Sequence, residues 1–249
     1  MESFKIGIVA FLLALACRRL PMGDAAEFSE VINVIEEKRL ELSKHKFFAM
    51  LGDESIPATK RMSFTPYWTF FAMEFADILD SWVWIENPKN ELERRINAFV
   101  QEDNFHYNFL LHDAEEILGF TLDRYGSYAG VMRHVWGDET KAIRQLMYSW
   151  IAWAKKTDDP MIVLTTFEAM EAGLKDLFEV AYAKVFLPAE GELKFLEYFG
   201  KTHVELEVNH TVTSWFKEGE QPYRPLSEIS VTEETKSLAL EVVEDIFEK

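Results

Sequence analysis

The chain is poor in cysteine and in basic residues. It has one cysteine, Cys17, and 26 Lys+Arg against 43 Asp+Glu in 249 residues, which gives a net charge of −17. A single cysteine excludes an intramolecular disulfide framework and a zinc or iron–sulfur site built on several cysteines. The acidic balance disfavours nucleic acid, whose phosphates need a basic face, and it equally disfavours a polybasic contact with anionic lipid. We therefore expect no nucleic-acid partner.

Long apolar runs are also scarce. The longest, residues 6–17, is too short to span a bilayer but has the size of a signal-peptide core. Residues 1–21 are open to three interpretations: an exported or lipoprotein-like leader ending at the Ala14–Cys17 box, an extension upstream of a start at Met22, or an ordinary N-terminal helix. We predict a cytoplasmic protein with its folded domain at 22–249, and export or lipoprotein anchoring remains the alternative.

Alternating β-branched runs are almost absent, whereas 48% of the residues are hydrophobic and 14% are aromatic, enough for a sizeable core. Apolar residues recur at helical spacing from Ala25 onward, with Gly and Pro breaks between segments. This pattern predicts one all-α bundle of seven or eight helices. The expected helices run approximately over 27–50, 59–84, 87–117, 140–155, 160–186, 192–217 and 230–247, with a short element between 125 and 138; the last of them has a capped start at 230–233.

Three potential metal ligands share one face of the late helix. On a helix of 100° per residue, Glu207 lies about 40° from His203, and His210 lies about 20° to the other side. Two imidazoles and one carboxylate within two turns form a ligand set suited to iron, manganese or zinc. The alternative is a polar helix face with two chance histidines.

A second acid–histidine cluster lies on the third expected helix. Glu102 and His106 are four residues apart, so both can hold one metal from a single face. Asp103 and His106 are the competing pair, three residues apart. His112 faces elsewhere on this helix, and we interpret it as a satisfied or surface histidine.

Two further carboxylates lie within apolar stretches, where an unpaired charge would be costly to bury. Glu74 is one, and the other is Glu168 or Glu171. We prefer Glu171 because Ala172–Gly173 leave room for a neighbouring helix. The alternative is that each carboxylate faces solvent. The candidate ligands are thus four carboxylates and three imidazoles, enough for two divalent ions whose charge the carboxylates balance: Glu74, Glu102, Glu171, Glu207, His106, His203 and His210.

The sequence resembles the haem-oxygenase-like di-iron oxidases and oxygenases, over residues 27–217. Their late helix reads His-x-x-x-Asp/Glu-x-x-His, and a glutamate precedes it by some thirty residues, as Glu171 does here. Their middle helix has an acid and a histidine before an apolar run ending Leu-Gly, which Leu118–Gly119 matches. Most members have Asp at the position of Glu207. Ferritin-like proteins instead carry two Glu-x-x-His motifs on separate helices.

This resemblance implies a haem-oxygenase-like fold that binds two Fe(II) ions and uses O₂ as co-substrate. It implies oxidation of a small carboxylate-containing molecule, an amino acid or a derivative, by C–C cleavage, desaturation or N-oxygenation. An external electron donor and a homodimer are compatible with it. Proposed pocket-lining residues are Phe71, Phe75, Phe105, Tyr107 and Phe167, and candidate cations for the substrate carboxylate are Arg61, Lys155 and Lys175.

Sister families fit less well. Thiaminase-II-like enzymes need a core cysteine, and haem oxygenases need a histidine on the first helix, where only His45 is near and looks solvated. Two other functions stay open. One is a self-modifying protein, like the death-domain-associated relatives, that oxidises one of its own side chains in a single turnover. The other is a metal-free helical binding module.

Overall fold

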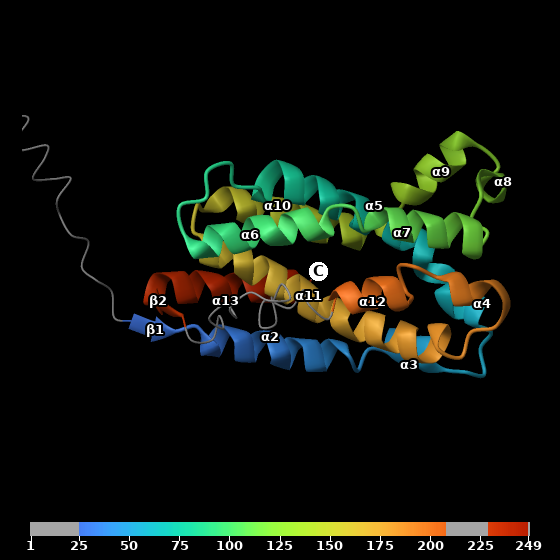
Figure 1. Ribbon diagram of the computed structural model, residues 1–249, viewed down its shortest axis with the longest axis horizontal. Coiled ribbons are helices and arrows are strands. Elements are labelled where there is room, and N and C mark those ends of the chain that lie inside the picture. Colours follow the sequence, from blue (N-terminus) through green and yellow to red (C-terminus); the bar gives the residue numbers. More distant parts are fainter. Residues whose placement is uncertain (1–24, 208–228, 249) are drawn as a thin grey trace, which may run out of the picture.

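The computed structural model describes residues 25–207 and 229–248 (Figure 1). This part of the chain confirms the all-α class. Its strands are two short segments, β1 (Ala25–Glu27) and β2 (Ser230–Thr232), which pair antiparallel with Ala26 opposite Val231. The helices are α2 (Ser29–Leu42), α3 (Lys46–Gly52), α4 (Ala58–Arg61), α5 (Thr65–Ile78), α6 (Glu91–Asp103), α7 (Tyr107–His112), α8 (Leu122–Tyr125), α9 (Tyr128–Val135), α10 (Lys141–Lys156), α11 (Pro160–Ala181), α12 (Lys201–Glu207) and α13 (Glu233–Glu248).

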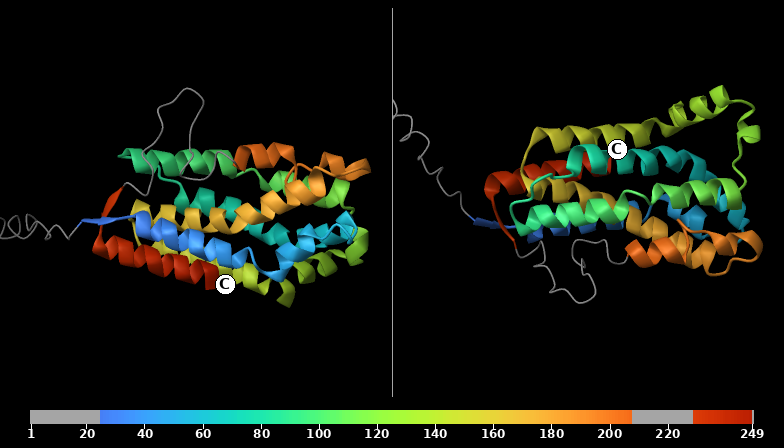
Figure 2. Two further views of the ribbon diagram at one scale, coloured as in Figure 1. Left: turned by 90° about the horizontal axis from the view of Figure 1, so that it is seen from below. Right: turned by 45° about the horizontal axis from the view of Figure 1, so that its top comes forward.

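Helix α11 is central to an elongated bundle, and it packs against α2, α3, α6, α10 and α13 (Figures 1 and 2). Its start follows the expected signal: Asp159 accepts a hydrogen bond from the N–H of Met161, and Pro160 occupies the first turn. The last helix begins at the end of its predicted start at 230–233, because Ser230–Thr232 forms β2 and Thr232 Oγ1 accepts the N–H of Thr235. None of the helices in the described ranges is long and apolar enough to cross a membrane.

The aromatic residues join four helices at mid-bundle. The ring of Trp150 on α10 lies 4.9 Å from Phe75 on α5 and 5.3 Å from Phe167 on α11. Phe167 in turn lies 4.5 Å from Phe99 on α6. These four side chains are almost fully buried, so they contribute to packing of the core.

Three of the expected helices are interrupted. Residues 27–50 form α2 and α3, because the His45 side chain caps α3 by accepting the N–H of Phe47. The expected helix over 87–117 is broken at 104–106, between α6 and α7. Residues 192–217 were expected to form one helix, and this is wrong at its start: Gly191–Phe195 is a 3₁₀ turn, 196–200 is not helical, and α12 begins at Lys201.

Three helices end in a π-helical turn: Leu79–Val83 after α5, Asp113–Ile117 after α7 and Tyr182–Phe186 after α11. These turns bring the helical segments close to the ends expected from the sequence. Gly119, with φ of +67°, follows the second turn and takes a left-handed conformation that favours glycine.

Candidate metal centre

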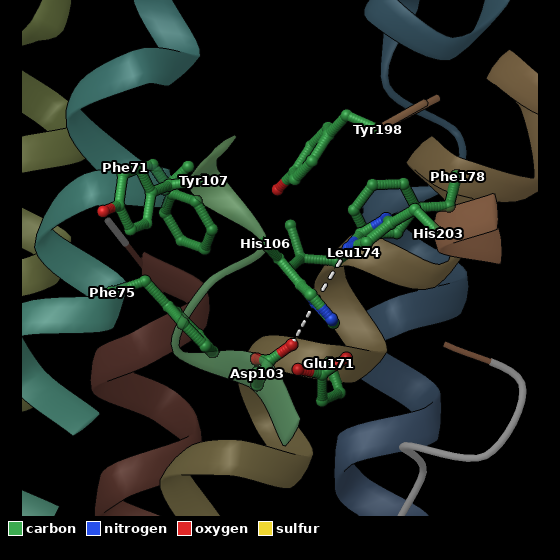
Figure 3. A pocket seen from close by; sticks show the side chains of 11 residues that line it. Phe71, Phe75, Asp103, His106, Tyr107, Glu171, Leu174, Phe178, Tyr198 and His203 are labelled. Atoms are coloured by element: carbon green, nitrogen blue, oxygen red, sulfur yellow. Dashed lines mark hydrogen bonds and ion pairs between the residues drawn. The ribbon is translucent and has the colours of Figure 1, made fainter. Parts of the chain in front are cut away.

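One pocket combines potential metal ligands with aromatic walls (Figure 3). It lies where α5, α6, the start of α7, α11 and the segment leading into α12 meet. Four lining residues have metal-ligand side chains, and the other seven are apolar or aromatic. The lining residues are Phe71, Ala72, Phe75, Asp103, His106, Tyr107, Glu171, Leu174, Phe178, Tyr198 and His203.

His106 contacts both Asp103 and His203 directly. Nδ1 of His106 lies 2.5 Å from Oδ1 of Asp103 and 3.1 Å from Nε2 of His203. All three side chains are buried. The break after α6 makes this possible, because α6 ends at Asp103 and the backbone N–H of His106 donates back to the Asp103 carbonyl.

Aromatic rings hold His203 in place. Its imidazole stacks on Tyr198 with a centroid distance of 4.4 Å and meets Phe178 edge-on at 4.8 Å. Its backbone N–H donates to the carbonyl of Glu197, just before α12. The orientation of His203 therefore depends on the non-helical segment 196–200 as well as on its own helix.

Glu171 brings a second carboxylate to the pocket from α11. Leu174 and Phe178 follow it at three and seven residues, so the three share one helix face and line the pocket together. Glu168, one turn earlier, is also buried but does not line this pocket. The preference for Glu171 over Glu168 agrees with this geometry.

Two predicted ligands lie away from the pocket. Glu102 is exposed. Asp103, the competing residue of the prediction, lines the pocket beside His106 in its place. The reason is the break at 104–106, across which a continuous-helix projection from Glu102 to His106 does not apply. Glu74 is half-buried on α5, where Phe71, Ala72 and Phe75 take the pocket-facing strip. The remaining two, the Glu207 side chain and His210, lie outside what the structure describes.

The burial of Glu74 still affects its chemistry. Desolvation raises the pKa of this carboxyl group, and the nearby Asp77 raises it further. The prediction that Glu74 avoids full solvation therefore agrees with the structure, but its role as a ligand has no support from its position.

Pocket-lining predictions were partly right. Phe71, Phe75 and Tyr107 line the pocket as predicted, whereas Phe105 is largely exposed and Phe167 packs in the aromatic core. Tyr198 and Phe178 were missed because they come from segments that only the tertiary structure brings to the pocket.

None of the three candidate cations reaches the pocket. Arg61 is buried, and its guanidinium donates to the carbonyls of Leu51, Ile56 and Lys184 at 2.8–3.0 Å. Lys155 lies over the ring of Trp82. Lys175 is largely exposed and pairs with a glutamate on its own helix. The described lining contains neither Lys nor Arg.

The types and spacing of the donors fit a transition metal. Two nitrogen ligands of one ion lie roughly 3 Å apart, and the 3.1 Å between the His106 and His203 nitrogens is in that range. As they stand, however, no three His, Cys, Asp or Glu side chains in the described ranges are spaced to hold an ion. A bound ion must therefore displace the direct contacts of His106.

The pocket is small. Its free volume is about 20 Å³, enough for a water molecule or an ion and far too little for an amino acid.

No protein-family model matches this sequence, and comparison with curated proteins finds no match. The case for a metal centre therefore rests on the residues themselves.

Proposed function

We propose that this protein is a non-haem iron oxidoreductase that uses O₂, with a haem-oxygenase-like arrangement of its helices. The observation that carries the proposal is the convergence of Asp103, His106, Glu171 and His203, from separate segments, in one buried aromatic pocket. Carboxylates and imidazoles are rarely gathered in a dry site without a cation to balance them. A reducing cytoplasmic compartment would keep the metal as Fe(II).

These four side chains offer two nitrogen and two carboxylate donors, which suits one ion. The second ion of a di-iron centre needs further ligands, and Glu207 and His210 remain the candidates from the sequence. When bound, iron supplies the activation of O₂ that side chains alone cannot perform.

The protein's own groups have separable roles in this proposal. Asp103 and Glu171 would balance the charge of the ion, and His106 and His203 would supply its nitrogen ligands. Phe71, Phe75 and Phe178 line the pocket with apolar rings that exclude water.

The small cavity favours a second candidate, oxidation of the protein's own side chain. A free volume of about 20 Å³ leaves no room for an organic substrate unless the walls move. Tyr198 points its hydroxyl into the pocket (Figure 3), next to His203. An oxidisable side chain is thus already in place, and the product of such a reaction is a modified protein formed in a single turnover.

Anaerobic reconstitution with Fe(II), followed by desalting and metal analysis, tests the proposal. We expect one to two iron ions per wild-type chain and at least a tenfold loss of affinity in His203→Ala and in His106→Ala. His45→Ala is the matched control, because His45 is exposed and only caps α3. Wild-type protein without stoichiometric iron would sink the proposal and leave the metal-free binding module.

A further inference from the structure

Asp113 is a buried carboxylate that the candidate metal centre does not include. It is the first residue of the π-helical turn after α7, and its side chain is fully inaccessible to solvent. Its two oxygens accept hydrogen bonds from three consecutive backbone N–H groups: Glu197 at 2.6 Å, Tyr198 at 2.9 Å and Phe199 at 3.2 Å.

The segment that Asp113 binds has no helix of its own to satisfy these amides. Residues 196–200 connect the 3₁₀ turn Gly191–Phe195 to α12. A buried N–H without an acceptor costs about 1–3 kcal/mol, so one carboxylate fixes the path of three successive residues. This resembles the capping of a helix start by an acidic side chain, supplied here from 84 residues away for Glu197.

The same segment controls His203 in two ways. The carbonyl of Glu197 accepts the backbone N–H of His203, and the ring of Tyr198 stacks on the His203 imidazole. Asp113 is not itself a pocket-lining residue, yet both restraints on His203 begin at residues whose N–H groups it holds.

We propose that Asp113 is a positioning residue, which sets the ring of His203 for metal binding through the backbone of residues 197–199. This inference rests on the proposed function, which supplies the iron that His203 would bind. It predicts that the Asp113 carboxylate influences iron affinity without contacting iron, as outer groups that orient ligands do.

His112 is the ionisable neighbour of this contact. Its Nδ1 lies 3.6 Å from Oδ1 of Asp113 and 3.7 Å from Oε2 of Glu197. The imidazole is partly exposed at the rim of the cluster.

The test compares Asp113→Asn with wild type, with Asp176→Asn as the matched control. Asparagine keeps the shape, but it replaces one acceptor oxygen by an NH₂ group that faces a backbone donor. Asp176 is another part-buried carboxylate, which pairs with Arg39 on α2. Two readouts are used: the iron dissociation constant, and the imidazole nitrogen resonances of His203 in the metal-free protein.

We expect Asp113→Asn to shift the His203 resonances and to weaken iron binding by about 10–100-fold. Asp176→Asn should lower stability without either effect. Unchanged His203 resonances, or iron affinity within twofold of wild type, would overturn the inference. If Asp113→Asn does not fold, Asp113→Glu keeps the charge, displaces it by one methylene and is judged by the same criteria.

The metal-free readout separates this inference from the proposed function. Wild-type protein that binds no iron would refute the iron proposal, and the His203 resonances alone would then decide whether Asp113 positions that ring. A shift in Asp113→Asn supports positioning, and no shift overturns it.

Discussion

Nδ1 of His106 and Nε2 of His203 lie 3.1 Å apart, although 97 residues separate them in the chain. The contact joins the break between α6 and α7 to the first turn of α12. Asp103 contacts the same nitrogen of His106, so His106 lies between a carboxylate and a second imidazole in a buried pocket. A cation at this point would replace two hydrogen-bonding contacts by stronger coordination bonds.

Asp103 and Glu102 make a matched pair of neighbouring carboxylates. Asp103→Asn should weaken iron binding at least tenfold, because Asp103 lines the pocket beside His106. Glu102→Gln should change it less than threefold, since Glu102 is exposed. Iron titration of the two variants measures the difference, and the reverse order would restore Glu102 as the ligand.

Tyr198 and Tyr107 both line the pocket and allow the two candidate functions to be told apart. If the protein oxidises itself at Tyr198, aerobic exposure of the iron-loaded wild type should change its intact mass once. Tyr198→Phe should keep iron and lose that change, whereas Tyr107→Phe should retain it. Repeated O₂ consumption at constant protein mass would instead indicate an external substrate.

Arg61 has a structural role rather than a substrate-binding one. Its guanidinium joins Leu51 in α3 to Lys184 in the π-helical turn after α11, and it also donates to the carbonyl of Ile56 in the loop after α3. Arg61→Lys keeps the charge but cannot reproduce the planar set of donors. We expect a loss of about 3 kcal/mol in the free energy of unfolding, seen in denaturant titration, with unchanged iron stoichiometry in the folded protein.

Lys60 supplies the control for this change, because it is exposed on the same short helix. Lys60→Ala should alter stability by less than about 0.5 kcal/mol. An Arg61→Lys variant as stable as wild type would contradict the structural role.

Protonation of Asp113 should change the free energy of unfolding with pH. Burial raises its pKa from 3.8 to about 6, against the opposing effect of the three backbone N–H donors. Because the folded state binds this proton more tightly than the unfolded state, the group adds stability as pH falls from about 6 to about 4. The amount is on the order of 3 kcal/mol.

Denaturant titration of the metal-free protein across this range measures the effect. Asp113→Asn removes the titrating group, so its stability relative to wild type should fall as the pH is lowered from about 6 to about 4. A constant difference between the two proteins over that interval would show that Asp113 does not titrate there.

The sequence by itself determined the helical class and several helix starts. Periodic apolar residues specify which face of a helix is buried, and local signals such as Asp159–Pro160 act within a few residues of themselves. The same local reasoning identified His106, Glu171 and His203, which the structure brings into one pocket. Glu171 was predicted because it lies within an apolar stretch, and His106 and His203 were predicted from the helical spacing of acids and histidines.

Only the tertiary structure showed that Asp103 rather than Glu102 lines the pocket and that Glu74 does not. It also showed that Tyr198 lines the pocket and that Asp113 binds the backbone of Tyr198. The physical reason is that helical periodicity relates residues only along an uninterrupted helix. The break at 104–106 resets the rotation between Glu102 and His106, and the non-helical segment 196–200 takes its path from a carboxylate on another helix. Such relationships depend on packing between segments far apart in the chain, and local sequence patterns do not predict that packing.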